Sequence, residues 1–274
     1  MNLKLVNETP KSPYDIRDYV INSQAASEFP ETFKCSVTVP VKNQGSKPTC
    51  AAHVLSSLVE YHNKRQTGTY TEFSTNFIYG YRPEGYYQGD GMIIRDALKT
   101  ISKVGNVYYS NCKGNYDVAK AIDCVNKNLN TLKEQAYPHR ISTYYRCNTT
   151  EEIKTALMTH GPVVVSITTH EGSRIKNDVY TYDPTKPGGR HCVLLYGWNE
   201  KGWLSQNSWG KLYAGDGRFI IPFDYKFNEC WGITDTIIPN ELKVKPRNGA
   251  LDRIYKLINF CINAWLSFVN SCEQ

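Results

Sequence analysis

The feature that most constrains the fold of this chain is a change in hydrophobic pattern near residue 150. Upstream, the segments 51–68 ("AAHVLSSLVEYHNKRQTG") and 91–105 ("GMIIRDALKTISKVG") are amphipathic at helical spacing, and each ends at a glycine that can close a helix. A third predicted helix spans 150–161, with Thr150 as its expected N-cap. Short apolar runs broken by glycine follow and predict strands of an antiparallel sheet or barrel: "PVVVSIT", "HCVLLYGW", "GWLSQNSW" and "GRFIIPF". Helices followed by strands predict an α+β chain with two lobes.

The same pattern predicts the domain boundaries. Residues 1–28 are polar and irregular and form an N-terminal extension. Residues 29–238 form the globular domain, with a helical lobe over about 29–145 and a β lobe over about 146–238. Residues 239–274 form an appendix, in which a basic linker precedes an apolar, helix-like tail.

Length and charge narrow the classes of protein to consider. A chain of 274 residues with 41% hydrophobic residues can bury one large core or two lobes that share a cleft. The net charge of +6 is spread along the chain, so we expect no nucleic-acid partner. The first residues lack the apolar stretch of a secretory signal, and no segment reaches the roughly 18 apolar residues of a membrane span. These features predict a cytoplasmic or otherwise reducing location.

The nine cysteines contain no CxxC pair and no other metal-ligand spacing, so the sequence predicts neither a metal site nor a cofactor. Cys50 stands apart because it lies at the start of the 51–68 helix, where free backbone N–H groups favour a thiolate. Gln44, six residues earlier, is followed by Gly45, so the loop can bring a side-chain amide beside the sulfur. Taken alone, these residues fit a buried structural cysteine better than a nucleophile.

Two downstream motifs change that interpretation. The run "GGRHCVLLYGW" places His191 at the start of a predicted strand, and "WLSQNSWGKLYAGDG" places Asn207 sixteen residues later, between two strands. Together with Gln44 and Cys50, this pattern resembles the papain-like cysteine peptidases, the family of papain and the cathepsins. The resemblance extends over about residues 29–238, and the separation of the cysteine from the histidine lies in the family's range.

The resemblance implies a papain-like two-lobed fold and a role for each matching residue. The helical lobe would carry Cys50, a β-barrel-like lobe would carry His191 and Asn207, and the active site would lie in the cleft between them. Cys50 would attack the scissile carbonyl, while His191 would protonate the leaving amine. Asn207 would orient the histidine ring, Trp209 would shield that hydrogen bond from water, and Gln44 would stabilise the oxyanion. The implied activity is that of a cysteine endopeptidase acting on protein or peptide substrates.

The residues that bind the substrate are less clear from the sequence. In "GYYQGDGMIIRD", Gly89, Asp90 and Gly91 resemble the family's glycine-rich cleft edge, where a substrate pairs like an added strand; a simple turn before a helix is the alternative. By rough alignment Asp235 falls near the floor of the second specificity pocket, where a carboxylate would favour Lys or Arg. A solvated or salt-bridged turn carboxylate is the alternative for this residue.

Departures from the family pattern leave alternatives open. Lys47 stands where the family often has a disulfide cysteine, which agrees with a reducing location. In place of the family's long pro-segment, the sequence has only the 1–28 extension, whose segment "SPYDIRDYVI" either packs on the surface or covers the cleft. Two other functions remain: an acyltransferase or transglutaminase-like enzyme with the same thiolate chemistry, and a catalytically weak papain-like binding module.

The tail predicts an amphipathic helix over 251–270 with a broad apolar face. Its dense apolar core is too short to span a bilayer. Three surfaces could cover it: the protein's own lobes, a partner or second copy, or a membrane surface, to which Lys243, Lys245 and Arg247 of the linker would be attracted.

Overall fold

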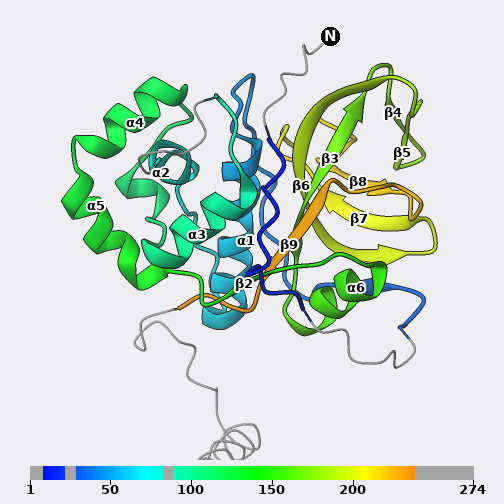
Figure 1. Cartoon of the computed structure of the whole chain (residues 1–274), viewed down its shortest axis with the longest axis horizontal. Coiled ribbons are helices and arrows are strands. Elements are labelled where there is room, and N and C mark those ends of the chain that lie inside the picture. Colours follow the sequence, from blue (N-terminus) through cyan, green and yellow to red (C-terminus); the bar gives the residue numbers. More distant parts are fainter. Residues whose placement is uncertain (1–8, 22–28, 83–88, 238–274) are drawn as a thin grey trace, which may run out of the picture.

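The computed structural model describes residues 9–21, 29–82 and 89–237. The predicted tail helix and its basic linker lie outside these residues. Figure 1 shows two lobes side by side, with helices on one side and a twisted sheet on the other, and the described part of the N-terminal extension between them. The predicted α+β, two-lobed architecture is therefore confirmed. No helix in the described ranges is both long and apolar enough to cross a membrane.

The helical lobe is organised around α1, which starts at Cys50, one residue before the predicted 51–68 segment. This helix ends before Gly68, whose φ of 74° is the left-handed conformation that closes a helix. The side chains of α1 are buried almost throughout its first fourteen residues, because the helix packs on the sheet with one face and on the other helices with the opposite face. The helices of this lobe are α1 (Cys50–Thr67), α2 (Thr75–Gly80), α3 (Ile94–Lys103), α4 (Val118–Asn126) and α5 (Leu129–Ala136), with short 3₁₀ turns at Tyr109–Asn111 and Tyr137–His139.

The β lobe is a nine-stranded sheet with the order β2-β9-β3-β6-β7-β8-β5-β4, and β1 pairs with β6 outside this path. The pairs are antiparallel except for β5 and β8, and the sheet is not closed into a barrel, so the barrel-like description is corrected to an open sheet. The strands are β1 (Phe33–Lys34), β2 (Tyr144–Arg146), β3 (Val163–His170), β4 (Arg174–Lys176), β5 (Val179–Thr181), β6 (Pro187–Asn199), β7 (Gly202–Gln206), β8 (Arg218–Ile221) and β9 (Glu229–Ile233).

Two local predictions differ from the structure. The helix α6 (Thr150–Thr159) is capped by Thr149, whose hydroxyl accepts from the Glu152 backbone N–H at 3.1 Å, so the cap lies one residue earlier than predicted. Residues 33–39 were assigned to the helical lobe, but β1 pairs with β6, and Cys35 and Val39 belong to the hydrophobic core of the β lobe. This segment is too short to carry a periodicity that would have revealed its partner.

The register of three central strands brings distant residues to one level of the sheet. Ile167 on β3 pairs with His191 on β6, and the preceding Ser166 pairs with Cys192 on one side and Glu229 on the other. Neighbouring strands lie about 4.8 Å apart, so the Glu229 backbone lies about 10 Å from that of Cys192. The sheet thus places a carboxylate near the strand that carries the predicted catalytic histidine.

Candidate active site

Cys50 is the first residue of α1 and is buried, with only 1% of its surface exposed. Its sulfur lies 3.2 Å from the Thr9 hydroxyl, which also lies 3.5 Å from the Cys192 sulfur. The neighbouring Cys192 thiol, together with His191 and Thr9, holds the pKa of Cys50 well below its usual value, although burial opposes this effect. The thiolate form needed by a nucleophile is therefore favoured.

His191 is held from two sides. Its Nε2 lies 2.8 Å from Asn207 Oδ1, and its ring stacks on Trp209 with a centroid separation of 4.4 Å. The Asn207 oxygen also accepts from the Ser208 backbone N–H at 2.7 Å, so its position is fixed independently of the histidine. With Nε2 engaged, the Nδ1 side of the ring is the side left to face the sulfur of Cys50.

Gln44 lies in the loop before Cys50 and is almost fully buried. Its Oε1 accepts from the Ser208 hydroxyl at 2.6 Å, and its Nε2 donates to the Lys47 carbonyl at 2.9 Å. The Ser208 carbonyl also accepts from the Gln44 backbone N–H. These bonds connect the loop before the cysteine to the loop that follows Asn207, so the two halves of the site are fastened together.

The glycine-rich segment at 89–91 lies at the rim of the helical lobe. Asp90 shares a hollow of about 570 Å³ with Ser46, Lys47 and Pro48, which belong to the loop leading to Cys50. The Gly89 carbonyl accepts from Arg82, and the Asp90 carbonyl accepts from Tyr79 and Arg82, while Gly91 is buried. The segment is therefore beside the site, but these two carbonyl groups are already engaged by the helical lobe.

The structure does not bring Asp235 to Cys50. Its carboxylate lies 3.4 Å from both His62 Nδ1 and Arg65 Nη2, and it also accepts from Gln66. These partners lie three or more helical turns beyond Cys50, which is roughly 18 Å or more along α1. The pocket role expected for Asp235 is not supported by this position, because β9 carries the chain away from the cleft before Asp235 is reached.

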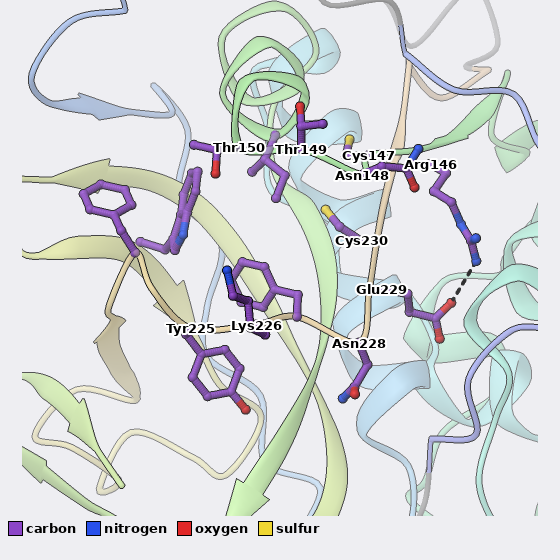
Figure 2. A pocket seen from close by; sticks show the side chains of 14 residues that line it. Arg146, Cys147, Asn148, Thr149, Thr150, Tyr225, Lys226, Asn228, Glu229 and Cys230 are labelled. Carbon is purple, nitrogen blue, oxygen red and sulfur yellow. Dashed lines mark ion pairs between the residues drawn. The ribbon is translucent and has the colours of Figure 1, made fainter. Parts of the chain in front are cut away.

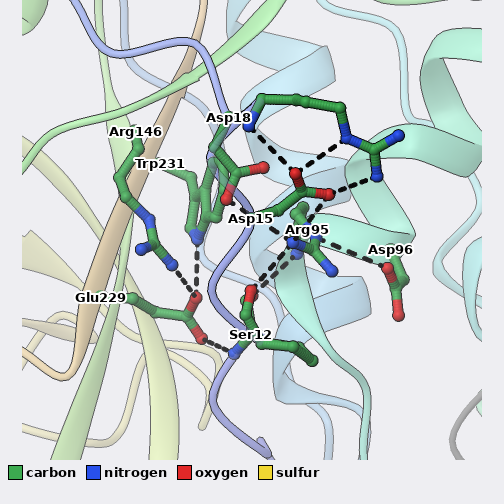
Figure 3. Close-up of polar contacts among 10 residues, drawn as sticks. Ser12, Asp15, Asp18, Arg95, Asp96, Arg146, Glu229 and Trp231 are labelled. Atoms are coloured by element: carbon green, nitrogen blue, oxygen red, sulfur yellow. Dashed lines mark hydrogen bonds and ion pairs between the residues drawn. The ribbon is translucent and has the colours of Figure 1, made fainter.

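Glu229 is a buried carboxylate on the sheet that no sequence pattern predicts at the site. It begins β9 and is buried, with Oε2 accepting from Trp231 Nε1 at 2.7 Å and lying 3.9 Å from Arg146 Nη2 (Figure 3). Its other oxygen, Oε1, accepts from the Ser12 backbone N–H at 3.3 Å. A single buried acid within "FNECWG" carries no signal of its role, since the role follows from strand register.

The described part of the N-terminal extension, residues 9–21, crosses the cleft, and we call it the strap. Figure 1 shows it running between the two lobes. Thr9 is buried, and its hydroxyl touches the sulfurs of both Cys50 and Cys192, at 3.2 and 3.5 Å. Of the two positions expected for this extension, the structure thus shows the one over the cleft.

The strap is attached to both lobes. On the helical side, Arg95 donates to the Pro13 carbonyl at 2.8 Å and pairs with Asp18 and Asp15 at 3.6 and 3.9 Å (Figure 3). On the sheet side, the Ser12 N–H donates to Glu229. The Arg146 backbone N–H also donates to the Tyr19 carbonyl, and the Arg146 carbonyl accepts from the Ile21 N–H. The strap is therefore anchored on each side of the cysteine.

A separate pocket of about 260 Å³ lies on the β lobe, between the start of β9 and the start of α6 (Figure 2). Its lining includes Glu229, Arg146, Cys147 and Cys230, but none of Cys50, His191 or Asn207. Within the described ranges, no group of three or more His, Cys, Asp or Glu side chains gathers as a metal site.

Replacing Cys192 with alanine is expected to shift the acid limb of the kcat/KM profile to higher pH by about one unit. The substitution removes the contact that most lowers the pKa of Cys50, so a higher pH is needed to form the thiolate. The rate of Cys50 alkylation by iodoacetamide, followed against pH, should show the same shift. Cys192→Ser keeps a donor and should restore the profile, and an unchanged acid limb in Cys192→Ala would contradict this role.

Sequence comparisons place the chain among known cysteine proteases. A family model described as "Papain family cysteine protease" matches residues 28–238. The chain is 31% identical over 149 residues to "Cathepsin B-like cysteine proteinase 4" of Caenorhabditis elegans. The matched region covers 52% of this chain but only 43% of that relative. The chain is 24% identical over 257 residues to an uncharacterized peptidase C1-like protein of Acanthamoeba polyphaga mimivirus, covering 83% of this chain and 76% of the relative.

Solved structures share the fold. Xylellain, a cysteine protease from Xylella fastidiosa, superposes with a TM-score of 0.73 at 21% identity, covering 85% of this chain and 97% of that one. A procathepsin B from Trypanosoma congolense superposes with a TM-score of 0.64 at 16% identity, covering 85% and 87% of the two chains. At such identities, these similarities concern the fold alone.

Proposed function

The chain belongs to the papain family of cysteine proteases, and we propose that it is an endopeptidase that cleaves protein or peptide substrates through Cys50, His191 and Asn207. The observation that carries this proposal is one connected set of contacts. His191 acts on the Cys50 sulfur, whose pKa it helps to lower, and its Nε2 lies 2.8 Å from Asn207 Oδ1. Nucleophile, base and orienting group thus form the constellation that thiol catalysis requires.

In the proposed reaction, the Cys50 thiolate attacks the scissile carbonyl, and the His191 imidazolium gives its proton to the leaving amine. A water molecule, deprotonated by His191, then hydrolyses the acyl-enzyme and releases Cys50. Asn207 keeps the ring in the orientation in which the Nδ1 side faces the sulfur. Trp209 stacks on the same ring and excludes water, which strengthens the bond between His191 and Asn207.

The oxyanion of the tetrahedral intermediate would be stabilised by the Cys50 backbone N–H and by Gln44. An amide nitrogen carries two hydrogens, and one of those on Gln44 Nε2 is used by the Lys47 carbonyl. The second hydrogen is the one that we assign to the oxyanion. The Ser208 hydroxyl, which donates to Oε1, supports this role because it fixes the amide plane.

The test combines labelling with cleavage. An active-site-directed epoxide is expected to modify Cys50 in preference to the other cysteines, and a diverse peptide library is expected to be hydrolysed. A binding module would show neither labelling at Cys50 nor turnover. An acyltransferase would incorporate an added amine in preference to water, and that result would replace the peptidase assignment.

We expect Glu229 to favour substrates with Lys or Arg two residues before the scissile bond. Its backbone pairs with Ser166, which pairs with Cys192 on the other side, and its Oε1 loses its Ser12 partner once the strap leaves. Glu229→Gln should lower kcat/KM for such substrates about tenfold relative to those with Leu, since charge-assisted bonds contribute about 1.5 kcal/mol or more.

Asp235→Asn is the matched control for this prediction. It removes a carboxylate that lies three helical turns from the cysteine, so the preference should not change. A loss of basic preference in Asp235→Asn, with none in Glu229→Gln, would return the specificity role to Asp235.

A further inference from the structure

A second thiol lies beside the proposed nucleophile. Cys192 follows His191 on β6, is fully buried, and lowers the pKa of the neighbouring Cys50 thiol. The Thr9 hydroxyl touches both sulfurs, at 3.2 Å from Cys50 and 3.5 Å from Cys192. Thr9 belongs to the strap and not to either lobe, so its contacts with both sulfurs are lost when the strap moves.

The two thiols differ in character. The contacts around Cys50 favour its thiolate, whereas burial raises the pKa of Cys192 well above its usual value and keeps it protonated. A thiolate is the form that peroxides oxidise, and a neighbouring thiol is what converts the product to a disulfide. Cys50 is therefore suited to oxidation by a peroxide, and Cys192 is suited to forming the disulfide that follows.

We propose that Cys50 and Cys192 form a reversible disulfide when a peroxide enters the cleft, so that the active site is also a site of oxidative modification. The effect on activity rests on the proposed peptidase function, whereas the formation of the bond does not. Cys192 is the residue that makes the modification reversible.

The chemistry balances in two steps. The Cys50 thiolate attacks one oxygen of the peroxide, the O–O bond breaks, and hydroxide leaves, so sulfur is oxidised to a sulfenic acid while the peroxide is reduced. The sulfur of Cys192 then attacks the sulfenic sulfur, the S–S bond forms, and the S–O bond breaks. The departing hydroxide takes the proton of Cys192 and leaves as water. A dithiol reductant then reduces the disulfide to the two free thiols by thiol–disulfide exchange and is itself oxidised to a disulfide.

The sequence offers a direct readout of this bond. Trypsin releases Cys50 in peptide 43–64, which stays intact because its internal lysine precedes proline, and releases Cys192 in peptide 191–201. Each peptide contains one cysteine, so a species with their summed mass less two hydrogens identifies the bond. The full-length protein is treated with hydrogen peroxide, blocked with iodoacetamide and digested.

The expected result is the linked peptide, with loss of peptidase activity that dithiothreitol restores. Cys192→Ala should lose activity as well, but dithiothreitol should not restore it, because Cys50 without a resolving thiol proceeds to sulfinic acid. Cys147→Ala, which removes another buried cysteine, is the matched control and should recover as the wild type does. The peptidase activity of each protein after treatment is compared with the activity of the same protein before treatment.

Oxidation is also expected to be faster in full-length Arg95→Ala, which loses the ion pairs that hold the strap. Absence of the linked peptide in both proteins, or equal recovery of Cys192→Ala and wild type, would overturn the proposal. A linked peptide in a protein that cleaves no peptide before treatment would instead refute the peptidase function and leave the disulfide standing.

Discussion

Deletion of residues 2–26 is expected to raise kcat/KM on small peptides by about 100-fold, because the strap occupies the place where a scissile bond must lie. A closed state favoured by about 3 kcal/mol leaves roughly 1% of the molecules open, and the apparent affinity for substrate falls by that fraction. The contacts of Thr9 with Cys50 and of Ser12 with Glu229 exclude a substrate from both positions.

Substitutions in the full-length chain test the same idea without a deletion. Arg95→Ala removes the bond to the Pro13 carbonyl and the ion pairs to Asp15 and Asp18, so it should raise activity in part. Ile16→Ala alters a side chain that is 85% exposed and should have no effect. Kinetics that do not change on deletion, in a protein with an unaltered melting temperature, would show that the strap does not block the site.

Cys50→Ala is expected to abolish hydrolysis, with a loss of at least about 10³-fold in kcat. The substitution removes one buried sulfur at the start of a long, well-packed helix, so the melting temperature should stay close to that of the wild type. Asn207→Ala should keep measurable activity, because the asparagine orients His191 and does not react itself.

Activity is measured in the strap-deleted protein, where the dynamic range is largest, alongside the full-length chain. Equal rates for wild type and Cys50→Ala would refute the peptidase mechanism. Asn207→Ala as inactive as Cys50→Ala, with an altered pH profile, would instead indicate that the asparagine contributes more than orientation.

Local patterns in the sequence were sufficient for the main elements. The helix at 50–67 is bounded by a proline-bearing turn and a glycine cap, and the strands β3 and β6 are dense apolar runs between glycines. Short strands such as β4 and β5 have no such pattern, since three residues cannot show an alternation. The N-cap at Thr149 was misplaced by one residue because adjacent threonines are equally suitable in sequence.

The sequence by itself determined which residues could react: a cysteine at a helix start, a histidine that opens a strand, and an asparagine in an NSWG loop. Such motifs are local, so their chemistry can be predicted without knowing which residues surround them in the folded structure. The tertiary structure alone decided which groups surround them. Strand register placed Glu229 near the cleft and Asp235 far from it. Lobe packing brought Cys192 beside Cys50, and the strap brought Thr9 onto the sulfurs of both. Thr9 lies more than 40 positions from Cys50 in the sequence, and Cys192 lies more than 140 positions from it. Such contacts depend on how the two lobes close around the cleft, and no local pattern encodes that closure.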